Sequence, residues 1–150
     1  MLTKLAVPSV LAVLAFTLGC DVTGPPADLR HAAANFTCGP ADGAATAITL
    51  ARDPITSTGP TSPYVGIMID AWPPTALAGR TWVVGTDFVG AWYTPGGGAM
   101  AEMASLGRVV VGSVDADSTI HGEVSLTFPS RQVVGAFTAP WIQRTGILCG

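Results

Sequence analysis

The sequence predicts an all-β fold, a small antiparallel sandwich or barrel of about seven or eight strands that follows a signal peptide and a short linker. From Ile120 to Phe128, apolar residues or glycine alternate with polar residues, a period of two that is typical of a strand with one buried face. Similar runs rich in valine and isoleucine recur about every ten residues. The 18 glycines and 12 prolines follow no collagen-like period, and we interpret them as turns between short strands.

The residues that interrupt the apolar runs place the individual strands. Asp53-Pro54 ends the first strand, Pro73-Pro74 ends the second, and Thr94 to Gly98 ends the fourth. Val109 to Val111 form a run continuous enough for burial on both faces, whereas Ala99 to Ser105 has helix-forming residues but is short for a helix. The strands are expected at residues 44–52, 64–72, 80–85, 88–93, 106–114, 120–128, 132–139 and 141–148.

The first twenty residues indicate export. Lys4 is followed by about fourteen mostly apolar residues, which fit the charged and apolar regions of a secretory signal peptide. This run is shorter than the roughly 20 residues that cross a bilayer core, so a permanent transmembrane helix is the weaker interpretation.

The run ends at Gly19 and Cys20, and these two residues resemble the end of a bacterial lipobox. Thr17 and Leu18 differ from the leucine and small residue usual in that motif. The resemblance to bacterial lipoproteins covers residues 1–20 only and implies that Cys20 carries a diacylglyceryl group on its sulfur and becomes the acylated N-terminus. The expected location is therefore the membrane of the bacterial cell envelope, with a secreted or periplasmic soluble protein and an uncleaved anchor as alternatives.

We expect three segments, because 150 residues suffice for one domain and not for two. These are a signal peptide at 1–19, the lipidated cysteine and a linker at 20–36, and a single β domain at 37–150. Within the linker, residues 21–27 are rich in glycine and proline, and residues 28–34 would form either two helical turns or extended chain.

If Cys20 is lipidated, Cys38 and Cys149 remain near the two ends of the domain. An even number of cysteines in an exported chain predicts a disulfide. It would close a loop of nearly the whole domain and stabilise it by on the order of 4–5 kcal/mol. Two buried free thiols are the alternative, and a metal site is less expected because two cysteines supply too few ligands.

The charge of the mature chain excludes one class of partner. From Cys20 onward there are six arginines, ten acids and no lysine, a net charge of 6 − 10 = −4. Such a chain lacks the basic footprint of a nucleic-acid-binding protein. The expected partners are the membrane, through Cys20, and an envelope protein or a glycan.

Three groups of polar residues resemble reactive sites. Residues 115–119 with Glu123 have the oxygens of a calcium loop but lack the glycine and final acid of an EF-hand, and a hairpin turn explains them equally well. His121 and Glu123 share the polar face of one strand and would act as base and acid or as ligands, yet no third ligand is spaced to join them. Asp70 and Asp87 would form a glycosidase-like pair.

The remaining candidates are aromatic. Trp92 and Tyr93, beside the glycines at 96–98, would stack on a sugar ring or a peptide, although tryptophan is more often part of a core. We therefore expect a lipid-anchored envelope protein that is a non-catalytic binding or structural module without a metal or cofactor. The alternatives are a carbohydrate- or peptide-binding domain that uses these aromatics, and a secreted hydrolase.

Overall fold

The computed structural model describes residues 28–61, 63–144, 147 and 149. The expected signal peptide, the lipidation site at Cys20 and residues 21–27 of the linker lie outside the described residues.

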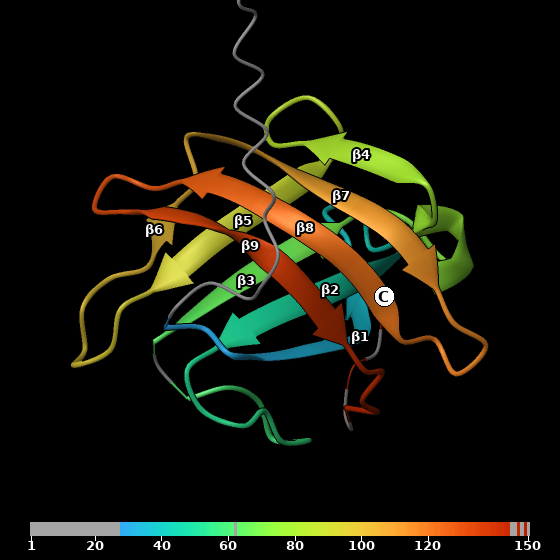
Figure 1. The fold of residues 1–150 in the computed structure, drawn as a ribbon, viewed down its shortest axis with the longest axis horizontal. Coiled ribbons are helices and arrows are strands. Elements are labelled where there is room, and N and C mark those ends of the chain that lie inside the picture. Colours follow the sequence, from blue (N-terminus) through green and yellow to red (C-terminus); the bar gives the residue numbers. More distant parts are fainter. Residues whose placement is uncertain (1–27, 62, 145–146, 148, 150) are drawn as a thin grey trace, which may run out of the picture.

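Two antiparallel sheets pack face to face as a β-sandwich (Figure 1). One sheet has the strand order β1-β2-β3-β5-β6, formed by β1 (His31–Cys38), β2 (Ala44–Ala51), β3 (Tyr64–Ile69), β5 (Val89–Thr94) and β6 (Glu102–Met103). The other has the order β4-β7-β8-β9, formed by β4 (Arg80–Val83), β7 (Leu106–Val114), β8 (Ile120–Thr127) and β9 (Gln132–Ala139). The prediction of a small antiparallel sandwich is confirmed, with nine described strands in place of seven or eight.

Helical structure plays little part in the described chain. A 3-10 turn, η1 (Pro74–Leu77), joins β3 to β4 and buries Leu77 against β7. Among the described residues there is no helix long and apolar enough to span a membrane.

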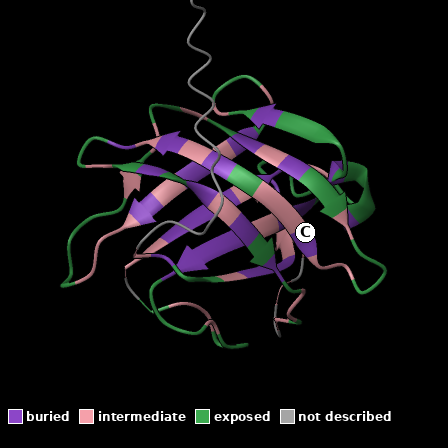
Figure 2. Ribbon diagram, in the orientation of Figure 1, coloured by how far each residue is buried: buried purple, intermediate pink, exposed green. Residues whose placement is uncertain are grey.

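The core cluster takes buried residues from both sheets, and Figure 2 shows buried residues along the strands of each. In β8 the predicted alternation is confirmed, because Ile120, Val124 and Leu126 are buried whereas Glu123 is exposed. Full burial of each such side chain stabilises the fold by about 1.5–3 kcal/mol. In β7, Val109 and Val111 are buried but Val110 is only half-buried, so the expectation of burial on both faces is wrong: a sandwich covers each sheet on one side.

The domain begins earlier than residue 37. Leu29 is 1% exposed within the core, and all eight residues of β1 pair with β2. The alanine-rich residues 31–34 therefore form a strand rather than helical turns or a linker. A helix of two turns is marginal by itself, and pairing with β2 outweighs the helix propensity of alanine.

Two other expected elements are also corrected. Residues 99–105 contain the short strand β6 and not a helix, because Met103 pairs with Trp92 of β5. Trp141 makes a single parallel bridge to Ala34 instead of starting a strand. Residues 145, 146 and 148 of that expected last strand lie outside the described residues.

The strands run between two ends of the sandwich, which we name for what each holds. The tether end is where the described chain begins, and there His31, Ala51, Tyr64 and Thr94 lie side by side across the sheet. The disulfide end holds Cys38. In Figure 1 the tether end lies on the left.

Candidate functional site

A hollow on the outer face of the five-stranded sheet is built around Trp92. Gly66 lies opposite Trp92 in the register of β3 and β5, and a Cβ on Gly66 would overlap the indole. The missing side chain therefore allows the indole to lie against the backbone of β3. The hollow measures about 160 Å³ and is bordered by polar or aromatic side chains from β1, β2, β3, β5 and the segment after β9: Asn35, Thr37, Thr49, Tyr64, Trp92 and Arg144.

The polar groups around the hollow are held by local contacts. Asn35 is 2% exposed, and its Nδ2 donates to the carbonyl of Phe36 at 2.6 Å. Arg144 extends from the segment after β9 to the loop before β3, where a Cβ on Gly59 would overlap its guanidinium. Since liquid water occupies about 30 Å³ per molecule, the hollow has the volume of about five waters.

Tyr93, expected to act with Trp92, points the other way. Successive strand residues face opposite sides of a sheet, so the Tyr93 ring enters the core and is 9% exposed. Its centroid lies 5.9 Å from that of Phe128, and the guanidinium carbon of Arg131 lies 4.8 Å from the centroid of Tyr93. Of the two predicted stacking residues, only Trp92 borders the hollow.

The guanidinium above Tyr93 also fixes the start of the domain. Arg131 donates from Nη1 and Nη2 to the two carboxylate oxygens of Asp28, at 2.8 and 2.7 Å. These hydrogen bonds hold the pKa of Asp28 below its ordinary value and raise the pKa of Arg131. Desolvation of each group opposes the shift without reversing it.

The four tryptophans have different environments. Trp82 is buried, with the guanidinium carbon of Arg80 4.0 Å from its ring centroid. Trp72 is 44% exposed, and its ring centroid lies 5.3 Å from Phe36 and 5.7 Å from Trp141. Trp82 is therefore part of the core, as is common for tryptophan, whereas Trp72 is not.

His121 is bonded to residues that the sequence did not single out as its partners. Its Nε2 lies 2.8 Å from Asp115 Oδ2, and its Nδ1 lies 3.2 Å from Thr138 Oγ1 (for either pair the tautomer decides which atom donates). The expected partner, Glu123, lies on the same outer face of β8 and borders the same hollow of about 390 Å³. Asp115 comes from the β7–β8 turn and Thr138 from β9, so cross-strand register was the signal that could have identified Thr138.

The chain of carboxylate, imidazole and hydroxyl has the order found in nucleophilic active sites. Here it lies on an open sheet face, where the side chains of His121 and Asp115 are 38% and 56% exposed. Within the described part of the chain, no three His, Cys, Asp or Glu residues group closely enough to hold a metal ion. We interpret these contacts as surface hydrogen bonds that join the turn to β8 and β9.

The acids proposed as calcium ligands lie in a hairpin turn. Asp115 N donates to the Thr119 carbonyl at 2.9 Å, and Thr119 N donates to Asp117 Oδ1 at 3.0 Å. The hydrogen bonds from Thr119 lower the pKa of Asp117. The turn interpretation of these residues is thus confirmed.

The two acids proposed as a glycosidase pair lie on adjoining segments, because Asp70 N donates to Phe88 O at 3.2 Å, and each carboxylate has its own local contact. Asp87 Oδ2 accepts a hydrogen bond from Val83 N at 2.7 Å within the β4–β5 turn. Asp70 lies beside Gly39, where a Cβ would contact its carboxylate. Both carboxylates thus have local structural contacts.

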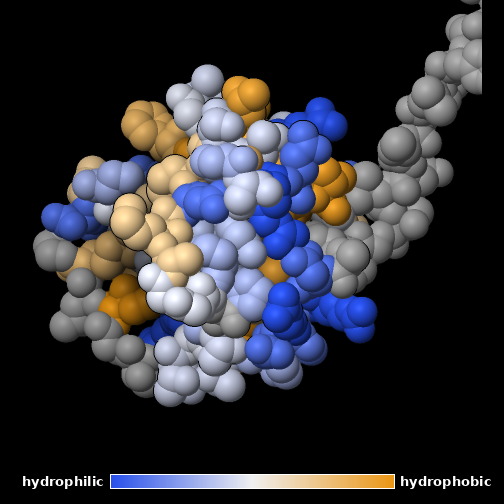
Figure 3. Space-filling model, turned by 90° about the vertical axis from the view of Figure 1, so that its left-hand side faces the viewer, coloured by the Kyte–Doolittle hydropathy of each residue, from blue (hydrophilic) through white to orange (hydrophobic). Residues whose placement is uncertain are grey.

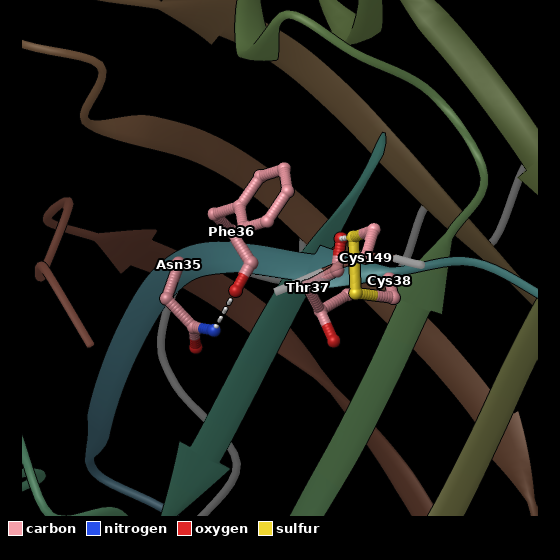
Figure 4. Close-up of a disulfide and its surroundings, with 5 residues drawn as sticks. All are labelled: Asn35, Phe36, Thr37, Cys38 and Cys149. Carbon is pink, nitrogen blue, oxygen red and sulfur yellow. Dashed lines mark hydrogen bonds between the residues drawn. A yellow bond between two sulfur atoms is a disulfide. The ribbon is translucent and has the colours of Figure 1, made fainter. Parts of the chain in front are cut away.

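The predicted disulfide between Cys38 and Cys149 is confirmed (Figure 4). Cys38 is the last residue of β1, and the two Cα atoms lie 5.4 Å apart across a sequence separation of 111 residues. Trp141, between β9 and Cys149, lies beside Ala34: the Ala34 N donates to Pro140 O and the Ile142 N donates to Ala34 O. The bond therefore holds the end of the chain against the first strand.

Comparisons with protein-family models, with curated protein sequences and with solved structures found no match to this chain.

Proposed function

We propose that this chain is an exported, lipid-anchored module of the bacterial cell envelope that acts by binding and not by catalysis. The observation that carries the proposal is the Cys38–Cys149 disulfide, because such bonds persist in oxidising compartments outside the cytoplasm. With Cys38 and Cys149 paired, Cys20 is the single cysteine left to carry lipid.

Metabolic labelling with an alkyne-bearing palmitate tests the anchor. The full chain should incorporate the label and fractionate with membranes, whereas Cys20→Ser should lose both properties. A matched Cys38→Ser variant alters the disulfide but leaves the lipidation site, so it should keep the label. An unlabelled full chain, or equal labelling of Cys20→Ser, would refute the anchor.

A second candidate function is carbohydrate binding at the hollow around Trp92. The indole lies over Gly66 beside Tyr64, and an aromatic ring offers an apolar face to the C–H groups of a sugar. Thr49 and Arg144 border the same hollow and supply a hydroxyl and a guanidinium for hydrogen bonds to hydroxyl or carboxylate groups.

Fluorescence titration with cell-wall oligosaccharides tests this candidate. Trp72→Phe serves as the background because Trp72 is exposed and would report non-specific contact. In that background we expect saturable fluorescence changes that Trp92→Ala abolishes. Unchanged fluorescence with sugars, together with a response to peptides that requires Trp92, would replace the carbohydrate assignment by a peptide one.

A further inference from the structure

The point at which the linker would meet the sandwich is set by two contacts. Leu29 is buried in the core, and Asp28 forms the paired hydrogen bonds to Arg131 in the β8–β9 turn. The chain that leads back to Cys20 must therefore leave from the tether end. Eight residue steps separate Cys20 from Asp28, so their Cα atoms lie at most about 28 Å apart.

A cationic pocket lies at this point of attachment. Asp28, Arg30, His31 and Arg52 line a hollow of about 410 Å³ at the tether end. The Asp28 carboxylate is already engaged by Arg131, which leaves the pocket dominated by basic side chains. A phosphate group is the natural ligand of arginines grouped in this way.

The tether end is also the least acidic part of the mature chain. It has three arginines, Arg30, Arg52 and Arg131, against three acids, Asp28, Asp53 and Glu102. The acids accept hydrogen bonds from Arg131, Thr61 and Ser130, respectively. The rest of the described chain has three arginines and six acids, so an anionic surface would meet less repulsion at the tether end than elsewhere on the domain.

An apolar loop extends from the same end. The β5–β6 connection passes through Gly96–Gly98 to Met100, which is 88% exposed. At its end, Glu102 Oε2 accepts hydrogen bonds from Ser130 N and Oγ, beside Arg131. Met103 and Leu106, which follow, are also exposed. In Figure 3, which views this end of the molecule, a patch of moderately apolar residues lies left of centre, beside hydrophilic residues. Exposed, flexible methionines suit insertion among lipid chains better than contact with water.

We propose that the tether end docks on the bilayer, with the pocket of Arg30, His31 and Arg52 binding the phosphate of an anionic lipid headgroup and the loop around Met100 entering the interface. The proposal rests on the lipid anchor at Cys20, since the short linker brings this end near the bilayer. Docking directs Cys38 and the aromatic group of Trp72 away from the membrane, because the eight residues of β1 span about 26 Å.

Spin labels on the acylated full-length mature protein test the orientation. A nitroxide at Met100→Cys reports on the tether end, and one at Ala116→Cys, in the β7–β8 turn at the opposite end, is the control; the bonded Cys38 and Cys149 do not take the label. On vesicles that contain equal amounts of phosphatidylcholine and phosphatidylglycerol, the nitroxide at position 100 should be accessible to oxygen and shielded from a water-soluble nickel chelate. The nitroxide at position 116 should stay accessible to the nickel chelate.

Charge variants separate headgroup binding from simple proximity. With about 1 kcal/mol per arginine near an anionic surface, Arg30→Gln with Arg52→Gln should shift the docked-to-undocked ratio by roughly 30-fold toward the undocked form. Arg80→Gln is the control, because Arg80 pairs with Val111, further from the tether end, and it should shift the ratio little, whereas Arg52→Gln alone should shift it roughly 5-fold. Equal effects of these two single variants would overturn the assignment of the pocket.

The mass of the same preparation distinguishes the two proposals. Acylated protein with position 100 as accessible to nickel as position 116 would overturn the docking and leave the anchor intact. Unacylated protein that still immerses position 100 on anionic vesicles would overturn the anchor and support the docking. Shielding of position 100 without vesicles would show that a second copy covers this end, which also overturns the docking.

Discussion

Removal of the Cys38–Cys149 disulfide should cost a large part of the stability of the domain. The bond closes a loop across 111 residues, and the chain-entropy relation gives about 5 kcal/mol for a loop of this length at 25 °C. A domain of ordinary stability has about 5–15 kcal/mol in total. With a urea m-value of about 2 kcal/mol/M, the midpoint should fall by about 2.5 M.

Urea unfolding of two samples checks this magnitude. The double variant Cys38→Ser, Cys149→Ser and the reduced wild-type protein should lose similar amounts of stability, because both release the same loop. Reductant should not change the double variant further. If the urea midpoint decreases by less than about 0.5 M in both samples, the loss of stability is under about 1 kcal/mol. That result would refute the loop-entropy reasoning.

Three further predictions concern single side chains. Gly66→Ala should displace the indole of Trp92 and lower the free energy of unfolding by about 1–3 kcal/mol. Gly90→Ala is the control, because a Cβ at Gly90 on the neighbouring strand meets open space. Equal losses of stability for the two variants in urea unfolding would refute the role of Gly66. Asp28→Asn should lower stability by at most about 1 kcal/mol at neutral pH, because Asp28 is 39% exposed. Because Arg131 lowers the pKa of Asp28, this stabilisation is present above the unfolded-state pKa and is lost as the pH falls through the folded-state pKa. The difference in unfolding free energy between wild type and variant should therefore disappear in acid. A difference that grows in acid would contradict the pairing. His121→Ala should cost less than about 1 kcal/mol by thermal unfolding because its partners are exposed, and a loss above about 3 kcal/mol would show that the contacts are more than surface hydrogen bonds.

The elements that could be predicted are those whose evidence is local. β7 and β9 have the predicted bounds because alternating side chains and turn residues mark both ends of each strand. β1 was missed because an alanine run has little hydrophobic contrast, and its strand character comes from pairing with β2 and with Pro140 and Ile142.

The candidate site was predicted in part for the same reason. Trp92 was singled out by residue type, but the hollow that it borders depends on Gly66 and Arg144, which are distant in sequence. The period of two already implied that Trp92 and Tyr93 face opposite sides of a strand. The disulfide was predictable from cysteine parity and the expected export, whereas the Arg131–Asp28 pair, separated by 103 residues, has no local signal.

The intact mass of the protein extracted from its native membrane, measured with and without reductant, tests the central claim most directly. We expect a polypeptide that begins at Cys20, carries lipid mass, and gains the mass of two hydrogens on reduction. A polypeptide without lipid that begins at or after Cys20, or one that retains Met1, would contradict the lipid-anchored assignment.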